Sequence, residues 1–358
     1  MKPAVAPDIH YDRMLGGSPR WREAIWAALK GHPDLFRSEF LALSGWAPSA
    51  AKTLSACYEY AKSGQQVFCV GPHLQEMLHY TDLSGVPEAF LRLPFPCFYV
   101  ALPQCPWSIW GGDRTQWHPV SGVYVQRRGT VLSFIFWGKE TDKSACIGDD
   151  AVFWLDLQLN ECLGKDEDTP GAFDIGTQLQ KQLSDLSRDA SDPLAPKWDT
   201  ARGRQNETLT SVLRVVINLV LYLNSSDPET TLVSDGGPER AELKKKVKRT
   251  KNKGKRRRYQ KRLAELSEAK VVWIGKSIED GKIRPRRATK TSSRAVKPHW
   301  RKGHFHPYWV GLRRDAEGNH RKGDHQVLKW VAPVFVGDMA DLVRSRGRIY
   351  MFTEDHAP

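Results

Sequence analysis

The stretch SGVYVQRRGTVLSFIFW, residues 121–137, predicts two β-strands joined by a tight turn. Both halves are rich in β-branched and aromatic side chains, and Arg127, Arg128 and Gly129 form the turn signal between them. Further extended runs flank this hairpin, CFYVAL from Cys97 and AVFWLDLQL from Ala151. The middle of the chain therefore predicts an antiparallel sheet.

Helical patterns lie on either side of these strands. Ser18 followed by Pro19 is typical of a helix start, and Gly64 is typical of the residue that follows a helix end. The run Val212–Leu223 is about half as long as a membrane span and contains Arg214 and Asn218, so it indicates a buried helix. The expected helices cover residues 19–31, 33–43, 48–61, 73–79, 174–188 and 205–224.

These patterns predict an α+β protein with a helical N-terminal part, a central antiparallel sheet, a long buried helix, a basic arm and a C-terminal β-hairpin element. With 358 residues, of which 40% are hydrophobic, the chain is long enough to bury a substantial core. We expect four regions: a mainly helical region at 1–90, the sheet with buried helices at 91–233, the basic arm with a short strand at 234–295, and a β region rich in histidine and aromatic residues at 296–358.

The six cysteines all lie in the first half of the chain and form no C-x-x-C pair. This spacing indicates reduced, mostly buried thiols rather than a zinc module. The N-terminal sequence lacks the apolar segment of a signal peptide. We therefore expect a cytoplasmic protein with no membrane partner and no cofactor.

Positive charge is concentrated in one segment. Between Arg240 and Arg262 the chain carries fourteen Lys/Arg residues and the single acid Glu242, whereas the rest of the chain has equal numbers of basic and acidic residues. This density predicts an arm that binds RNA or DNA phosphates with little sequence preference and steep salt dependence, with Tyr259 available for stacking. The alternative is a solvated, solubilising loop. The residues expected to contact nucleic acid are Lys244, Lys245, Lys246, Lys248, Arg249, Lys251, Lys253, Lys255, Arg256, Arg257, Arg258, Lys261 and Arg262.

The arm has no obvious way to neutralise these charges internally. Crowded like charges repel one another along a helix. Without a ligand we therefore expect an extended segment or a fraying helix here, followed by a short strand, VVWIG, from Val271.

The sequence HWRKGHFHPYWVG, residues 299–311, is rich in histidine and aromatic residues, and HQVLKWVAPVFVG from His325 predicts a partner strand. In a strand His304 and His306 point the same way, and with His299 they could bind zinc. Arg301 and the neighbouring lysine would repel a dication, so no metal site is expected.

A metal-free ribonuclease is a second interpretation of the same histidines, since His299, His304 and His306 could serve as general base and acid while Arg301 and Lys302 hold a phosphate. Packing of these side chains in a small sheet is the alternative. Nucleotide-binding glycine loops and the G-x-S-x-G nucleophile pattern are absent from the sequence. Glu76 and His79 have E-x-x-H spacing, which as a single copy is most often structural, so no catalytic residue is assigned.

The order of segments near the C-terminus resembles that of a known family. VVWIGKSI, VKPHWRKGHFHPYWVG and LKWVAPVFVG follow the basic tract in turn, and LRLPFPCFYVAL lies earlier in the chain. This order is similar to the second described family of type V-A anti-CRISPR proteins, which are carried by plasmids and phages. The frame of the match consists of Pro298, His299, Arg301, Gly303, His304, Phe305, His306, Tyr308, Trp309 and Gly311.

The resemblance implies a binding protein that recognises the N-terminal segment of a nascent type V-A effector nuclease in the bacterial host cell. Such recognition leads to translation-dependent loss of the effector mRNA, and the basic arm would contact RNA or the ribosome. Two other functions stay open: a ribonuclease, and a plasmid nucleic-acid-binding protein whose affinity comes from the basic arm. The residues expected to bind the peptide are His299, Arg301, His304, Phe305, His306, Tyr308, Trp309 and Trp330.

Overall fold

The computed structural model of the protein describes residues 11, 19–46, 48–87, 90–110, 117–138, 152–158, 198–235, 237–265, 270–279, 299–301, 303–312, 323 and 325–336. The helices are α2 (Pro19–Leu29), α3 (Asp34–Trp46), α4 (Pro48–Lys62), α5 (Pro72–His79), α7 (Trp198–Leu223), α8 (Gly237–Arg249), α9 (Lys253–Glu265) and α10 (Lys276–Glu279). The strands of the central sheet are β1 (Gln66–Val70), β3 (Cys97–Ala101), β4 (Ser108–Trp110), β5 (Trp117–Arg128), β6 (Val131–Gly138), β7 (Val152–Gln158), β8 (Thr230–Asp235) and β9 (Lys270–Ile274). The smaller sheets contain β2 (Thr81–Asp82), β10 (His299–Arg301), β11 (Gly303–Val310), β12 (His325–Val331) and β13 (Val334–Val336).

The central sheet has the strand order β7-β6-β5-β3-β1-β9-β8, with β4 beside β5. The hairpin expected at 121–137 is confirmed: β5 and β6 are antiparallel, Arg128 pairs with Val131, and Gly129 in the turn has φ +59°. β3 and β7 are also antiparallel to their neighbours β5 and β6. The α+β class is therefore confirmed.

The sheet as a whole is mixed, because β1 is parallel to both β3 and β9. Parallel neighbours need a crossover connection, and α5 lies in the chain between β1 and β3. Since β1 is a short strand between two helices, its own sequence gives little indication of this pairing.

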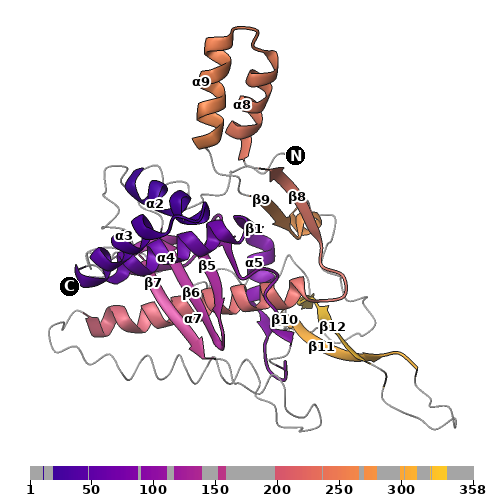
Figure 1. The fold of residues 1–358 in the computed structure, drawn as a ribbon. Coiled ribbons are helices and arrows are strands. Elements are labelled where there is room, and N and C mark those ends of the chain that lie inside the picture. Colours follow the sequence, from indigo (N-terminus) through magenta and orange to yellow (C-terminus); the bar gives the residue numbers. More distant parts are fainter. Residues whose placement is uncertain are drawn as a thin grey trace, which may run out of the picture.

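Helices cover both faces of the sheet (Figure 1). Alternate residues of the central strands point to opposite faces, so Phe98 and Val100 belong to one core cluster while Cys97 and Tyr99 belong to the other. The first cluster includes α5 and α7, and the second includes α2, α3 and α4. Burial on both faces explains the continuous apolar runs of β1 and β3.

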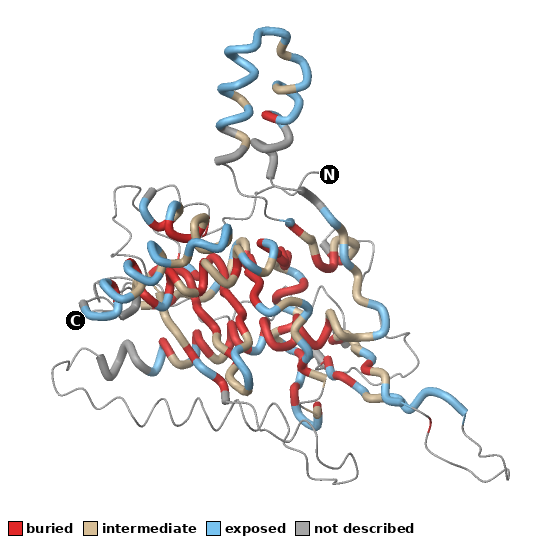
Figure 2. The backbone as a smooth tube through the Cα atoms, viewed as in Figure 1, coloured by how far each residue is buried: buried red, intermediate tan, exposed pale blue. Residues whose placement is uncertain are grey.

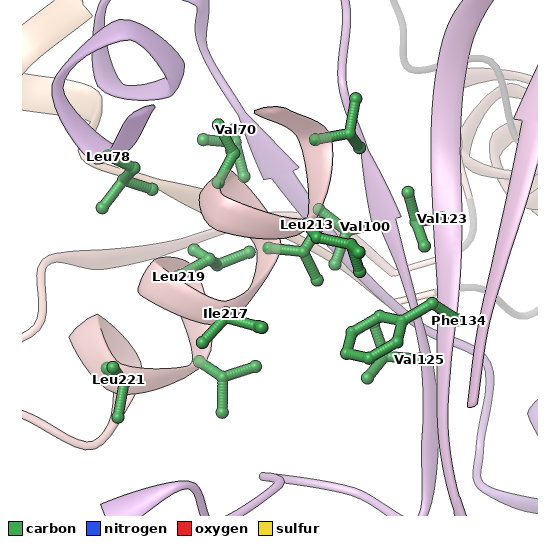
Figure 3. Packing of buried hydrophobic residues seen from close by; sticks show 14 of the residues in the cluster. Val70, Leu78, Val100, Val123, Val125, Phe134, Leu213, Ile217, Leu219 and Leu221 are labelled. Carbon is green, nitrogen blue, oxygen red and sulfur yellow. The ribbon is translucent and has the colours of Figure 1, made fainter. Parts of the chain in front are cut away.

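Helix α7 supplies the largest share of the first cluster. Figure 3 shows Leu213 and Ile217 facing the sheet residues Val100, Val125 and Phe134. Residues 203–223 are long and apolar enough to cross a membrane, but 72% of the apolar window is buried inside the protein. The buried helix that the sequence predicts is therefore confirmed, and Figure 2 shows it as a mostly buried segment.

The helices expected near residues 19–31, 33–43, 48–61 and 73–79 correspond to α2, α3, α4 and α5. Gly31 and Gly64 follow helix ends with φ of +90° and +82°, conformations that glycine adopts without strain. The helix expected at 174–188 lies outside the described residues.

The described cysteines are free thiols, as the sequence predicts. Cys57, Cys69 and Cys97 are buried and Cys105 is half-buried, while Cys146 and Cys162 lie outside the described residues. Burial raises the pKa of Cys57 to about 12, against the smaller opposing effect of its hydrogen bond to the hydroxyl of Tyr124. Such thiols are protonated at neutral pH, which makes them unsuitable as nucleophiles.

Candidate functional site

The histidine-rich segment forms one strand of a two-stranded antiparallel ribbon, β11–β12, that runs from Gly303 to Val331. At its base β11 also pairs in parallel with β2, through Gly303 opposite Thr81 and His304 opposite Asp82. Figure 1 shows the far end of the ribbon extending away from the helices and the central sheet. The antiparallel pairing of these two segments is thus confirmed. We call this element the ribbon.

One face of the ribbon packs on the protein core. Phe305 and Leu328 are 5% and 1% exposed and belong to the same core cluster as α7. Trp330 packs against this cluster, with its ring 5.0 Å from that of Tyr222 in an edge-to-face arrangement. The inner face therefore fixes the ribbon to the body. The boundaries of the four regions expected from the sequence, including the one at residue 296, stay a prediction.

Polar bonds reinforce this attachment. The indole Nε1–H of Trp330 donates to Thr81 Oγ1 at 3.2 Å, and the Thr81 hydroxyl donates to the Met77 carbonyl at 2.9 Å. Asn218 of α7, which is fully buried, donates through Nδ2 to the carbonyls of Leu78 and Thr81 at 2.7 and 3.0 Å. Ribbon, α5 and α7 are thereby joined at one point.

The opposite face of the ribbon is exposed. Because side chains alternate along a strand, His304, His306 and Tyr308 project from this face, and all three are exposed. The rings of His306 and Tyr308 lie edge-to-face at 4.4 Å. The ammonium group of Lys329 lies 6.0 Å from the Tyr308 ring centre, at the limit of a cation–π contact.

The far end of the ribbon exposes large apolar side chains. Tyr308, Trp309 and Val310 are 43%, 42% and 44% exposed, and Leu312 just beyond them is 70% exposed. Contiguous apolar groups of this kind are unfavourable in water and mark sites at which another molecule binds. With two imidazoles on the same ribbon, this end can bury apolar side chains of a partner while it hydrogen-bonds to the partner's polar groups.

The structure separates the predicted peptide-binding residues into groups. His304, His306 and Tyr308 share the exposed face, whereas Phe305 and Trp330 face the core and do not line a surface with Tyr308. Trp309 has the parity of the inner face but is 42% exposed, near the end of β11 that lies away from β2. His299 and Arg301 lie in β10, which pairs with β13, and their side chains lie outside the described residues.

Sequence reasoning missed three contributors to this site. Lys329 lies opposite His306 in the register of β11 and β12. The alternation of polar and apolar residues in HQVLKWV indicates that Lys329 lies on the exposed face. Val310 and Leu312 were missed because nothing in the sequence shows where the supporting body ends. Within the described part of the chain, no group of three or more His, Cys, Asp or Glu side chains is placed to hold a metal ion.

The basic segment forms two helices, α8 and α9, and not the extended or fraying segment that charge repulsion predicts. The helices pack as an antiparallel pair that stands away from the sheet (Figure 1). Leu243 is 7% exposed and Val247, Tyr259 and Leu263 are half-buried. Each helix thus contributes apolar residues at i and i+4, which form a seam that offsets the repulsion. We call α8–α9 the basic hairpin.

Most of the predicted nucleic-acid-binding residues are exposed on the basic hairpin. Asn252 caps α9 by accepting a hydrogen bond from the backbone N–H of Lys255 at 3.1 Å. Gly254, Arg257, Arg258, Gln260 and Lys261 line a shallow depression on α9. The exposed basic residues are Lys244, Lys245, Lys246, Lys248, Arg249, Lys251, Lys253, Lys255, Arg256, Arg257, Arg258 and Lys261, whereas the side chain of Arg262 lies outside the described residues.

Helix α5 places the half-buried His79 beside Trp107. Its ring lies 5.0 Å from that of Trp107, and its pKa is lowered by burial and by the positive charge of Arg214. The E-x-x-H spacing therefore has a structural explanation.

Comparison with known proteins agrees with the C-terminal motif. The model of the AcrVA2-like family, anti-CRISPR type V subtype A2, matches residues 68–338, well beyond the last hundred residues that carry the resemblance. A crystal structure of AcrVA2 aligns over 91% of this chain and 96% of its own, with a TM-score of 0.43 and 16% identity. No curated protein matches. Because the family model covers most of the chain, the protein belongs to the AcrVA2-like family of type V-A anti-CRISPR proteins.

Proposed function

We propose that this anti-CRISPR protein recognises the N-terminal segment of the type V-A effector nuclease while it is being translated, and thereby causes loss of the effector mRNA. Membership of the family supports an anti-CRISPR function with such an effector as the target. The observation that supports recognition of a nascent peptide is the exposed apolar end of the ribbon, from Tyr308 to Leu312. In this proposal the protein acts in the bacterial cytoplasm, where translation takes place.

An extended polypeptide fits this surface chemically. A peptide that emerges from the ribosome has unpaired backbone groups and exposed side chains, and short motifs of this kind are held by strands and apolar contacts. Tyr308, Trp309 and Leu312 supply apolar contact area, while the exposed His304 and His306 supply ring nitrogens for backbone groups. Aromatic residues dominate the energetics of such interfaces.

The basic hairpin supplies the second half of the proposal, contact with RNA or the ribosome. Its exposed basic residues lie on both helices, and Figure 2 shows both helices as mostly exposed segments. A protein that binds both a nascent chain and nearby phosphates remains close to the message being translated, since linked weak sites reinforce each other.

A translation reporter tests the proposal. The first effector codons are fused to a reporter gene in three forms: unchanged, synonymously recoded, and frame-shifted so that nearly the same nucleotides encode another peptide. We expect the protein to lower the mRNA of the first two forms and to leave the third unchanged. Loss of the effect on recoding, or its persistence after the frame shift, would show that the peptide is not what is recognised.

A matched pair of leucine variants localises the effect. Leu312→Ala and Leu41→Ala remove the same atoms from side chains that are both 70% exposed, one at the ribbon and one on α3. We expect Leu312→Ala to reduce mRNA loss and Leu41→Ala to leave it unchanged. Equal effects of the two variants would contradict a docking role for the ribbon.

A ribonuclease is the second candidate function. His304 and His306 lie on the same exposed face, and Lys329 lies opposite His306, where it could hold a phosphate. Incubation of purified protein with labelled RNA, beside the His304→Gln/His306→Gln variant, decides the matter. If the protein cleaves the RNA and the double variant does not, the ribonuclease function is supported in place of the binding function. If the RNA stays intact, the ribonuclease function is excluded.

A further inference from the structure

The basic hairpin is an insertion in the connection between two paired strands. β8 and β9 are antiparallel neighbours, and their last pair is Asp235 with Lys270. The chain leaves the sheet after Asp235, forms α8 and α9, and returns at Lys270. The hairpin is therefore held at its base by two adjacent strands, and Figure 2 shows exposed residues along both of its helices.

The charge of the hairpin is not balanced within it. Residues 237–265 contain fourteen Lys/Arg and three acidic residues. Glu242 lies 3.7 Å from Lys246 with both side chains largely exposed, and an exposed pair of this kind stabilises a helix very little. Lys253, Lys255 and Arg256 lie in the first turn of α9, where cations oppose the helix dipole. A bound polyanion would offset both the repulsion between the basic side chains and the unfavourable interaction of the first-turn cations with the helix dipole.

The shape of the hairpin argues against a single-stranded ligand. Proteins that bind single strands combine a basic groove with exposed rings on which bases stack. The aromatic residue of the hairpin, Tyr259, is half-buried in the seam with Leu263, and the residues that line the depression on α9 include no aromatic side chain. The stacking role that the sequence suggests for Tyr259 therefore does not fit its position.

The spread of charge over both helices favours phosphate contacts over reading of base edges. One α-helix fills the major groove of B-form DNA, so only one helix of the pair could enter it, whereas the exposed cations lie on both. The major groove of an RNA duplex is narrower still. The exposed lysines and arginines of both helices can reach the phosphate rows that border a groove.

We propose that the basic hairpin binds the phosphate backbone of double-helical nucleic acid without reading its sequence. The inference rests on the proposed function only for the source of the duplex, because a translated message and the ribosome present folded RNA. A DNA duplex presents the same phosphate chemistry. The dense phosphates of a duplex match the dense exposed cations on both helices of the hairpin.

Binding of three labelled probes tests this inference. The probes are an RNA stem-loop duplex, an unstructured U-rich RNA with the same number of phosphates, and a DNA duplex, each titrated by fluorescence anisotropy at several salt concentrations. We expect the full chain to bind duplexes at least about tenfold more tightly than the single strand, with affinity falling steeply as salt rises. The tighter of the two duplexes identifies the source. Equal or stronger binding of the single strand, or affinity that is independent of salt, would overturn the inference.

Hairpin variants assign the binding to this element. Replacing residues 236–269 with Asn-Gly should remove duplex binding, and Arg257→Gln/Lys261→Gln should weaken it at least about fivefold. The matched control Lys30→Gln/Arg37→Gln removes two exposed cations from outside the hairpin and should change nothing. Tyr259→Leu keeps the seam apolar and should retain binding. Loss of binding in Tyr259→Leu, at an unchanged melting temperature, would indicate stacking and contradict the inference.

The outcome is separable from that of the proposed function. The Asn-Gly variant retains the ribbon, so it should still bind an effector N-terminal peptide in the same anisotropy assay. Retained peptide binding with lost duplex binding supports the inference. Duplex binding that survives removal of the hairpin overturns it, whatever the reporter assay shows for the peptide.

Discussion

Phe305 and Trp309, four positions apart on β11, have different structural roles in this protein. Phe305 is almost fully buried and holds the ribbon to the core, whereas Trp309, near the other end of β11, is 42% exposed. The two aromatic side chains look equivalent in the sequence motif. Their surroundings, and not their chemistry, decide which of them is available to a partner.

Alanine substitution at these two positions should therefore have opposite effects. Phe305→Ala leaves a cavity in the core and should lower the free energy of unfolding by about 3–5 kcal/mol. Trp309→Ala should leave the melting temperature nearly unchanged but weaken binding of the effector peptide by about 2 kcal/mol or more. Thermal melts and binding titrations on the same samples separate the two effects. A Trp309→Ala protein that unfolds early would show that this residue is structural.

The thiol of Cys57 should be inert in the folded protein. Burial raises its pKa to about 12, so at pH 8 the thiol is protonated and also inaccessible to reagents. We expect iodoacetamide to modify Cys57 only after unfolding in urea, as measured by mass spectrometry of the peptide that contains it. Rapid labelling of Cys57 under native conditions would contradict the packing of α4 on the sheet.

Elements with local signals could be predicted from the sequence, and elements that depend on distant partners could not. The β5–β6 hairpin follows from its turn, and the ribbon from its alternation. β1 is parallel to strands far along the chain, so no local pattern reveals its place. For the site, strand periodicity predicts that His304 and His306 share a face. Which face is covered depends on α7 and β2, which the motif does not contain.

The basic hairpin shows the same distinction. The spacing of Leu243 with Val247 and of Tyr259 with Leu263 indicates an apolar seam, whereas the density of positive charge favours an extended segment. Solvent and salt weaken the repulsion between exposed charges. They do not weaken the apolar contacts of a buried seam in the same way. Packing between the two helices therefore outweighs the repulsion along each of them.

The contact between α7 and the base of the ribbon should depend on Asn218. In Asn218→Leu, the carbonyls of Leu78 and Thr81 lose their donor in a buried setting, which should lower the free energy of unfolding by about 1–3 kcal/mol. Thr210→Ala, which removes a bond within one turn of the same helix, is the control and should cost much less. Urea denaturation measures both, and equal effects would contradict a joining role for Asn218.

At the scale of the whole molecule, a three-layer body carries two projecting elements, the ribbon and the basic hairpin (Figure 1). Each is fixed at its base by strand pairing, through β2 in one case and through β8 with β9 in the other. The body supplies stability, and the projections supply the exposed apolar and cationic surfaces. Loss of one projection should therefore leave the other intact.

Removal of the basic hairpin should leave the body folded. The core residues of both clusters lie outside residues 237–265, so we expect the Asn-Gly variant to melt within a few degrees of the full chain. Differential scanning calorimetry checks this expectation. A large fall in melting temperature would show that the hairpin supports the sheet.

The register of Asp235 with Lys270 has a practical consequence. Cα atoms of paired strands lie only about 5 Å apart. We therefore expect the junction to accept an inserted domain of any length whose N- and C-termini lie close together. A fluorescent protein or an affinity tag grafted there would report on the inhibitor in living cells without touching the ribbon. In-frame gain or loss of sequence at this junction would change the inserted element and leave the body of the protein unchanged.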